Sequence, residues 1–287
     1  MKFAFIEVHL ALLFPLDLVC HVLDVSRSGY YAWQKRPQSN RARRREELAL
    51  QIQQVHDENR RVYGSPRVFN ELKLQGKSVC ENTVADIMKE RKIRAKTKRK
   101  FVPPTTDARH DQPVADNILD RQFQAELPNQ KWAVDITYIP TGEGWLYLAG
   151  VMDLCSRKIV GWSMADHMET SLVSDALKMA LVHRRPEQGL LHHSDRGVQY
   201  ASDEYQHLLQ TNGMQISMSG KGDCWDNAVM ESFWSTFKTE MVHHEEFATH
   251  EQARAAIFEY IEVFYNRKRL HSSLGYQSPE AFEASLN

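Results

Sequence analysis

The sequence predicts an α/β (α+β) protein in which a helical front region precedes a mixed five-stranded sheet with its helices. Apolar residues recur at helical spacing up to about residue 100, whereas short apolar runs separated by turn residues begin near residue 129. With 287 residues, 42% of them hydrophobic and 10% aromatic, the chain can fill two ordinary cores. We expect a soluble protein with a helical DNA-binding region over 1–100, a linker over 101–125, a catalytic core over 126–242 and a C-terminal helical extension over 243–287.

Charge is distributed unevenly along the chain, although the net charge is only −1. Residues 1–110 contain 22 Lys and Arg against 12 Asp and Glu, and residues 111–287 contain 14 against 25. The two parts therefore carry net charges of +10 and −11. A basic front and an acidic back suit a protein that holds a polyanion with one part and metal ions with the other.

The cysteines and the N-terminal stretch exclude several classes of protein. Cys20, Cys80, Cys155 and Cys224 are far apart, which argues against a zinc ribbon and a disulfide scaffold and favours a reducing cytoplasm. The apolar stretch 8–23 is interrupted by proline, aspartate and histidine. We therefore expect neither a signal peptide nor a membrane span.

Residues 16–34 have the pattern of a helix-turn-helix. Apolar residues at 16, 19, 20 and 23 form one helical face, residues 24 and 25 form a tight turn, and Ser26 is placed to cap the second helix. The second helix would present Arg27 to a DNA groove, but helical hairpins of this length also occur as packing units. Both interpretations stay open.

A second helix-turn-helix-like pair is expected over residues 63–95, after a charged helix over 41–61. A basic run follows, in which seven of the ten residues from 91 to 100 are Lys or Arg. Such a run suits contact with DNA phosphates, although a solvated linker has a similar composition. The expected phosphate-binding residues are Arg94, Lys96, Lys98, Arg99 and Lys100.

Strands and helices alternate after residue 129. Strands are expected over 131–139, 145–154, 158–164, 190–193 and 214–218, and helices over 171–183, 203–210 and 226–242. In this layout the first strand is central and the fourth is its parallel neighbour, with the last helix packed nearby.

Three carboxylates stand in positions that suggest a metal site. Asp135 lies inside an apolar strand, Asp195 directly follows the fourth strand, and Glu231 lies one turn into the last helix. A buried carboxylate costs several kcal/mol unless something positive meets it, and the predicted layout brings all three to one end of the sheet. Two Mg²⁺ or Mn²⁺ ions, roughly 3.5–4 Å apart, suit such oxygen ligands and support phosphodiester displacement.

Neighbouring residues extend this hypothesis. Glu231, Trp234 and Lys238 share one helical face, which places a cation for DNA beside the carboxylate. Asn227 could orient a ligand or water, but the simpler expectation is that it caps the helix.

Other polar residues near the trio have structural explanations. Asp153 is expected at a strand end, paired with Arg157 or a turn amide. His192 and His193 could assist water or DNA, but hydrogen-bonded structural histidines are more common.

Several segments in this order carry a resemblance to a known family. They are Val25–Tyr31, Tyr63–Arg67, Trp132–Tyr138, His193–Gly197, Asp226–Glu231 and Tyr265–Pro279. On these segments the chain resembles, over nearly its whole length, the transposases encoded by the second open reading frame of bacterial insertion sequences of the IS three type. The core of that family is similar to retroviral integrase.

The resemblance implies an RNase H-like core whose catalytic trio corresponds to Asp135, Asp195 and Glu231, with 35 residues between the last two. It further implies that Lys238 is an additional basic residue and that the helical front binds terminal inverted repeats. Hydrolysis at an element end would free a 3′-hydroxyl, which would then attack target DNA. The family also implies a homo-oligomer on DNA, a possible fusion to the product of the upstream frame, and association with the bacterial nucleoid.

Two other functions stay open on the sequence alone. A metal-dependent nuclease would cut DNA without rejoining it. A DNA-binding regulator of transposition would keep the fold without the chemistry, but such a protein has no evident use for these three carboxylates.

Overall fold

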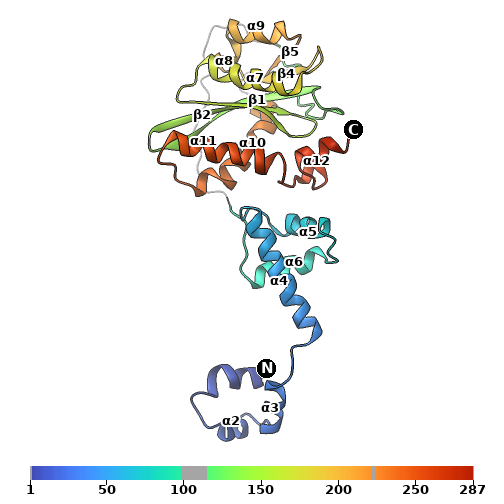
Figure 1. Ribbon diagram of the computed structural model, residues 1–287, viewed down its shortest axis with the longest axis vertical. Coiled ribbons are helices and arrows are strands. Elements are labelled where there is room, and N and C mark those ends of the chain that lie inside the picture. The colour runs from blue at the N-terminus through green and yellow to red at the C-terminus, as the bar shows by residue number, and fades with distance from the viewer. Residues whose placement is uncertain (1, 98–114, 221–223, 287) are drawn as a thin grey trace. The chain divides into compact units, whose positions relative to one another are not determined.

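The computed structural model describes residues 2–97, 115–220 and 224–286. The chain forms two compact units, Met1–Gln54 and Val55–Asn287, whose elements are drawn in Figure 1. In the portions of the chain that are described, no helix is both long and apolar enough to cross a membrane.

The first unit is a small helical bundle with its own core. It contains α1 (Lys2–Phe5), the π-helix η1 (Ile6–Leu10), α2 (Leu16–Val22), α3 (Arg27–Gln34) and most of α4 (Asn40–Glu58). The predicted hairpin is confirmed, since Asp24 takes a φ of 52° in the turn and Ser26 accepts a hydrogen bond of 3.0 Å from the Gly29 amide. Ile6 is fully buried against Val19, Cys20 and Tyr30, so the N-terminal turn completes the packing of the hairpin.

The helical pair predicted over 63–95 is present, and it belongs to the second unit together with the sheet. Helix α5 (Ser65–Leu74) buries Val68 and Leu72, and α6 (Glu81–Glu90) buries Val84, Ile87 and Met88. The Tyr63 hydroxyl accepts a hydrogen bond of 2.8 Å from the Leu270 amide and donates one of 3.3 Å to the Lys268 carbonyl. This pair of bonds attaches the start of α5 to the C-terminal part of the same unit.

A mixed sheet of five strands lies at the centre of the second unit. Its strands are β1 (Lys131–Thr141), β2 (Gly144–Asp153), β3 (Ile159–Ala165), β4 (Leu191–Ser194) and β5 (Gln215–Met218), in the order β3-β2-β1-β4-β5. Strands β1, β2 and β3 are antiparallel, whereas β4 is parallel to both β1 and β5. The prediction that the first strand is central, with the fourth as its parallel neighbour, is confirmed.

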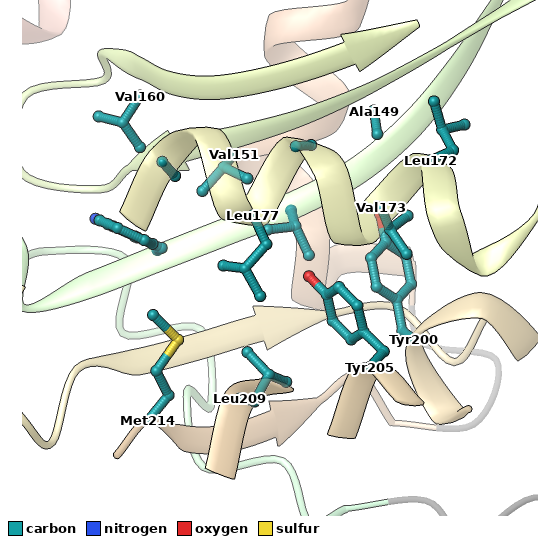
Figure 2. Close-up of a cluster of buried hydrophobic side chains, with 14 of the residues drawn as sticks. Ala149, Val151, Val160, Leu172, Val173, Leu177, Tyr200, Tyr205, Leu209 and Met214 are labelled. Atoms are coloured by element: carbon teal, nitrogen blue, oxygen red, sulfur yellow. The ribbon is translucent and has the colours of Figure 1, made fainter. Parts of the chain in front are cut away.

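Alternation along the strands builds the main core. Trp132 and Val134 of β1 face the same side as Ala149 and Val151 of β2, because these residues are register partners or diagonal neighbours. Helix α7 (Thr170–Arg184) covers this side with a row of apolar residues. Figure 2 shows this cluster, with Leu172, Val173 and Leu177 above the strands and Tyr200, Tyr205, Leu209 and Met214 beside them.

A glycine sets how closely α7 approaches the sheet. A Cβ atom on Gly161 of β3 would lie 2.3 Å from the Ala176 carbonyl oxygen and 2.7 Å from the Ala180 Cβ. Any larger residue at this position would push the helix away from the strand. Helix α10 lies on the other side of the sheet from α7 (Figure 1).

The remaining helices agree with the predicted pattern. They are α8 (Val198–Ala201), α9 (Asp203–Thr211), the 3₁₀ turn η2 (Cys224–Asn227), α10 (Ala228–Glu240), the 3₁₀ turn η3 (Val242–His244), α11 (His250–Phe258), the π-helix η4 (Glu259–Tyr265), the 3₁₀ turn η5 (Ser272–Leu274) and α12 (Pro279–Ala284). The helix expected over 226–242 thus begins as a 3₁₀ turn and ends two residues early. The C-terminal helices pack on the core, and the Asn266 side chain pairs with both the amide and the carbonyl of Ile159, each at 2.9 Å.

Part of the expected linker belongs to the packed structure. Residues 101–114 lie outside the described residues, but from Ala115 on the chain runs against β5. Ile118 and Leu119 donate backbone hydrogen bonds of 2.9 and 3.0 Å to the Ser217 hydroxyl, and Leu119 is 1% exposed. This segment therefore anchors one edge of the sheet.

Candidate active site beside strands β1 and β4

Asp195 directly follows the end of β4, and Asp135 lies in the middle of the neighbouring parallel strand β1. The register of β1 and β4 pairs Trp132 with His192 and Ala133 with His193. The same register carried on by two residues brings Asp135 level with Asp195. A hydrogen bond of 2.8 Å from the Ile136 amide and one of 2.9 Å from the Gly197 amide fix the two carboxyl groups.

Glu231 comes from the first turn of α10, and its side chain is exposed. Trp234, one turn later, packs on Gly150, the register partner of Asp135. This contact lays the helix against the strand pair that carries Asp135.

The expectation that Asn227 caps α10 is wrong. Its side chain makes no capping hydrogen bond. Instead, its amide Nδ2 donates a bond of 3.2 Å to the carbonyl of Val134, next to Asp135, and its Oδ1 is buried with no hydrogen-bond partner. The strand carbonyl outcompetes the helix amides because η2 turns the side chain toward β1. Asn227 thus ties the start of the Glu231 helix to the Asp135 strand.

The carboxylates act on one another. Burial, the neighbouring Asp195 and, more weakly, Glu231 together raise the pKa of Asp135 to about 8, against the opposing effect of the Ile136 amide. Burial also raises the pKa of Glu231. The indole N–H of Trp234 favours the ionised form of Asp135, although it makes no hydrogen bond of ordinary geometry. No ion pair to Asp135 is present within the described residues.

Lys238 lies on the same side of the sheet as Asp135. Burial lowers the pKa of Lys238, and the attraction of Asp135 opposes that effect. Its Nζ lies 4.7 Å from the ring centroid of Tyr138, a cation–π contact that holds the ammonium over the end of β1. Lys238 and Asp135 thus attract each other, and the role of this lysine at the site stays a prediction.

The site has the chemistry of a divalent-cation site. Asp135 and Asp195 supply hard oxygen donors whose mutual repulsion an added cation would relieve. Among the described side chains, however, no group of three His, Cys, Asp or Glu residues already encloses a metal position. Glu231 raises the pKa of Asp135 less than Asp195 does. The Glu231 carboxylate would have to move closer to share an ion with the two aspartates.

The predicted DNA-binding residues are spread over both units. Arg27 pairs with Asp17 at 2.7 Å on the surface of the first unit, and Arg94 is exposed. The Lys96 ammonium donates a hydrogen bond of 3.0 Å to the backbone carbonyl of Glu240 at the end of α10, so this lysine already has a structural contact. Lys98, Arg99 and Lys100 lie outside the described residues.

The neighbouring polar residues have structural roles, as expected. His192 bonds to the Tyr205 hydroxyl at 3.0 Å and His193 to the Ser217 hydroxyl at 2.9 Å, and burial lowers their pKa values to about 3 and about 4. Both rings are therefore neutral at pH 7.

Asp153 accepts turn amides, as expected, but not the Arg157 side chain. Its Oδ1 accepts hydrogen bonds of 2.9 and 3.3 Å from the amides of Cys155 and Ser156. The nearest guanidinium is that of Arg184, at 3.7 Å. Arg157 has a left-handed backbone, with a φ of 62°, and lines a pocket that is described below.

Sequence reasoning did not assign a role to Asp226, which anchors the loop before α10. Its carboxylate accepts bonds from the Asn117 side chain at 2.9 Å, the Gly220 amide at 2.7 Å and the Arg121 guanidinium at 3.1 Å. Burial by itself would raise the pKa of Asp226, but the Gly220 amide and Arg121 lower it below its usual range. Its place in the segment 226–231 was the available sequence signal, since two of its three partners, Asn117 and Arg121, lie 109 and 105 residues away in the chain.

The chain matches two kinds of known domain. The family described as Integrase core domain matches residues 125–224, a second family of that description matches residues 212–279, and an HTH-like domain matches residues 43–101. The last match contains the helical pair predicted over 63–95, and the first two confirm the expected integrase-like core.

Curated relatives extend over almost the whole chain. The transposase InsF for insertion sequence IS3A of Escherichia coli (strain K12) is 46% identical over 285 residues, which are 99% of this chain and 98% of that protein. The insertion element IS600 uncharacterized 31 kDa protein of Shigella sonnei is 46% identical over 264 residues, which are 92% of this chain and 97% of that protein. A solved simian T-cell lymphotropic virus intasome in complex with PP2A regulatory subunit B56 gamma is 14% identical, with a TM-score of 0.45, and the match covers 81% of this chain and 74% of that one. The chain therefore belongs to the IS3 family of insertion-sequence transposases with an integrase core domain.

Proposed function

We propose that Asp135, Asp195 and Glu231 form the catalytic centre with which this transposase cuts the ends of an insertion sequence and joins them to target DNA. The observation that carries the proposal is the juxtaposition of Asp135, in the middle of β1, with Asp195, directly after β4, where their repulsion helps to raise the pKa of Asp135. A fold gains no stability from two neighbouring carboxylates that repel each other. Such a pair is retained where a cation and its chemistry are needed.

The three carboxylates would hold Mg²⁺ or Mn²⁺, with two ions as the proposed number. When bound, these ions would activate the attacking oxygen and stabilise the leaving oxygen of a phosphodiester. Asp135 and Asp195 would provide the fixed part of the site, since both are held by backbone amides. Glu231 would provide the adjustable part.

The chain's own residues position the DNA around this centre. Lys238 would contact a phosphate beside the scissile bond, since its ammonium lies on the Asp135 side of the sheet. Asn227 and Trp234 would hold α10 at the distance from β1 that Glu231 needs. In the first step water hydrolyses the bond at an element end, and in the second the freed 3′-hydroxyl attacks target DNA.

The proposed partners follow from these two steps. The helical segments before the core would bind the terminal inverted repeats, with Arg27, Arg94, Lys96 and the basic run that follows contacting phosphates. Joining two ends of one element requires at least two copies of the chain on DNA. Fusion to the product of the upstream frame would supply further DNA-binding and oligomerisation segments.

A cleavage and strand-transfer assay tests the proposal. A labelled duplex that carries the element's end is incubated with Mg²⁺ or Mn²⁺ and the chain, alone and fused to the upstream product. We expect cleaved and joined products that are lost in Asp135→Ala, Asp195→Ala and Glu231→Ala, while DNA binding is retained. Asp175→Ala is the matched control, because Asp175 is exposed on α7 and pairs only with Lys178, at 3.2 Å.

Other outcomes would assign a different function. Cleavage without joining would indicate a nuclease, and tight binding with neither product would indicate a regulatory DNA-binding protein. Near wild-type activity of any one of the three variants would remove that residue from the centre.

A further inference from the structure

A pocket of about 360 Å³ lies beside the first two turns of α10. Its wall contains Ser232 and Thr236 of α10, and its floor contains Met152 of β2. Ser232 directly follows Glu231, and Met152 pairs with Ala133 of β1. The pocket therefore adjoins the proposed catalytic centre but is lined by none of its three carboxylates.

Three arginines from distant parts of the chain line this pocket. Arg67 comes from α5, Arg157 from the turn after β2, and Arg269 from the segment after η4. His271 lines it as well, and burial together with the charges of Arg269, Arg67 and Arg157 lowers the pKa of His271 to about 2. All three guanidinium groups lower the pKa of the same imidazole, and all three line the same pocket. They therefore converge on this pocket.

The positive charge of the pocket is only partly neutralised. Glu240 accepts hydrogen bonds of 2.7 and 2.8 Å from Arg269 and one of 2.8 Å from the Tyr260 hydroxyl. Its distance to Arg67 is 3.8 Å, at the limit of an ion pair. Glu240 thus lies beside two of the three guanidinium groups, those of Arg269 and Arg67.

Arg157 has the least compensated charge of the three. Within the described residues its guanidinium makes no ion pair or hydrogen bond, and burial lowers its pKa. Asp153 attracts it from a distance, but that carboxylate is held by Arg184 and by turn amides. A partly buried guanidinium without an anion is costly unless a ligand supplies one.

The lining suits a tetrahedral oxyanion. Guanidinium groups bind phosphate oxygens through paired N–H donors, and the hydroxyls of Ser232, Thr236 and Ser272 add donors of adjustable direction. The N-terminal turn of α10, which also lines the pocket, favours negative charge at the same place.

We propose that the pocket between Arg67, Arg157 and Arg269 binds a backbone phosphate of the DNA whose end is processed. This inference rests on the proposed function, because it assigns to that DNA a second contact beside the scissile phosphate. The arginines come from α5, the turn after β2 and the C-terminal extension, so one phosphate would hold these three parts in place beside the helix that carries Glu231.

Arg157→Gln tests the assignment, with Arg185→Gln as the matched control. Both arginines have left-handed backbones, with φ of 62° and 44°, but Arg185 is exposed at the end of α7. Affinity for the end duplex is measured over a range of salt concentrations, together with the thermal midpoint of each variant. Arg157→Gln should weaken binding about tenfold and reduce the slope of log K against log salt by about 1, whereas Arg157→Lys should keep the slope. Arg185→Gln should match the wild type.

A scan with neutral methylphosphonates identifies the phosphate itself. At one position near the cleaved end, the neutral group should weaken wild-type binding about tenfold and affect Arg157→Gln much less. If Arg157→Gln does not fold, Arg157→Lys replaces it, because a point charge loses the paired hydrogen bonds to the same phosphate. Equal losses in wild type and variant at every position would overturn the assignment.

Two further outcomes separate this inference from its alternatives. An unchanged DNA affinity and salt slope in folded Arg157→Gln would refute phosphate binding in the pocket and leave the proposed cleavage chemistry intact. DNA binding by the wild type without cleavage would refute the proposed function alone. Inorganic phosphate could raise the thermal midpoint of the wild type but not of Arg157→Gln, while both proteins bind DNA equally well. That result would show a site for a free anion and overturn the DNA assignment.

Discussion

Gly150 of β2 lies directly against the indole of Trp234, since a Cβ atom on Gly150 would be 3.0 Å from Cη2 of that ring. Gly150 is also the register partner of Asp135, and Trp234 follows Glu231 by one helical turn. The missing side chain at Gly150 therefore sets the separation between the strand that carries Asp135 and the helix that carries Glu231.

Gly150→Ala should move α10 away from β1. The added methyl group meets a bulky ring that is 5% exposed, so overpacking should cost about 1–3 kcal/mol of stability. Cleavage should fall about tenfold or more, because Glu231 moves with the helix. Thermal unfolding and the cleavage assay measure the two effects. Trp234→Phe in the same chain should restore part of both, and a double variant no better than Gly150→Ala would contradict this explanation.

Asn227→Ala should reduce activity more than stability. The change removes one hydrogen bond to the Val134 carbonyl, worth about 0.5–1.5 kcal/mol, but releases the start of α10 beside Asp135. We expect cleavage to fall roughly 10- to 100-fold at unchanged DNA affinity. Asn212→Ala is the control, since Asn212 also donates to one carbonyl, that of Leu208 at 2.8 Å, at the end of α9. Equal activities of the two variants would exclude a positioning role.

The stability of the metal-free protein should fall as pH rises from about 4 toward 8. The pKa of Asp135 is raised to about 8 in the fold, so the folded state holds a proton that the unfolded chain has already released in this window. Asp135→Asn removes this difference and should raise the thermal midpoint more at pH 8.5 than at pH 5, measured with EDTA. Asp175→Asn should show no such dependence, and an identical effect of Asp135→Asn at both pH values would disprove the raised pKa.

Glu240→Ala should destabilise the second unit strongly. Arg269 is 3% exposed, and although burial by itself lowers its pKa, the hydrogen bonds that it donates to Glu240 raise that pKa above the ordinary value. Removal of Glu240 leaves this buried charge unpaired, at a cost of about 3–5 kcal/mol, which is about 10 °C in Tm. Glu280→Ala, which breaks the exposed pair with Arg267 at 3.5 Å, should cost less than about 1 kcal/mol. Similar shifts in Tm for both variants would show that the buried pair adds little.

Much of the fold was predictable because local patterns and tertiary structure agree. The strand alternation in 131–139 and the apolar row of 171–183 predicted β1 and α7 almost to their ends. The N-terminal turn Ile6–Leu10 has no comparable periodicity, and it is ordered by packing on Tyr30 and Val19. The predicted domain boundaries stay predictions, although residues 115–119, expected in a linker, pack against β5.

The sequence by itself determined the order of the elements, the positions of Asp135, Asp195 and Glu231 in them, and the family. It could do so because period, turn residues and motif spacing are local properties of the chain. Only the tertiary structure decided that Asn227 bonds to Val134 rather than to its own helix, and that Arg67, Arg157 and Arg269 meet in one pocket. Those contacts join residues about 90 to 200 positions apart, and their geometry depends on how helices seat on the sheet, which no local pattern specifies.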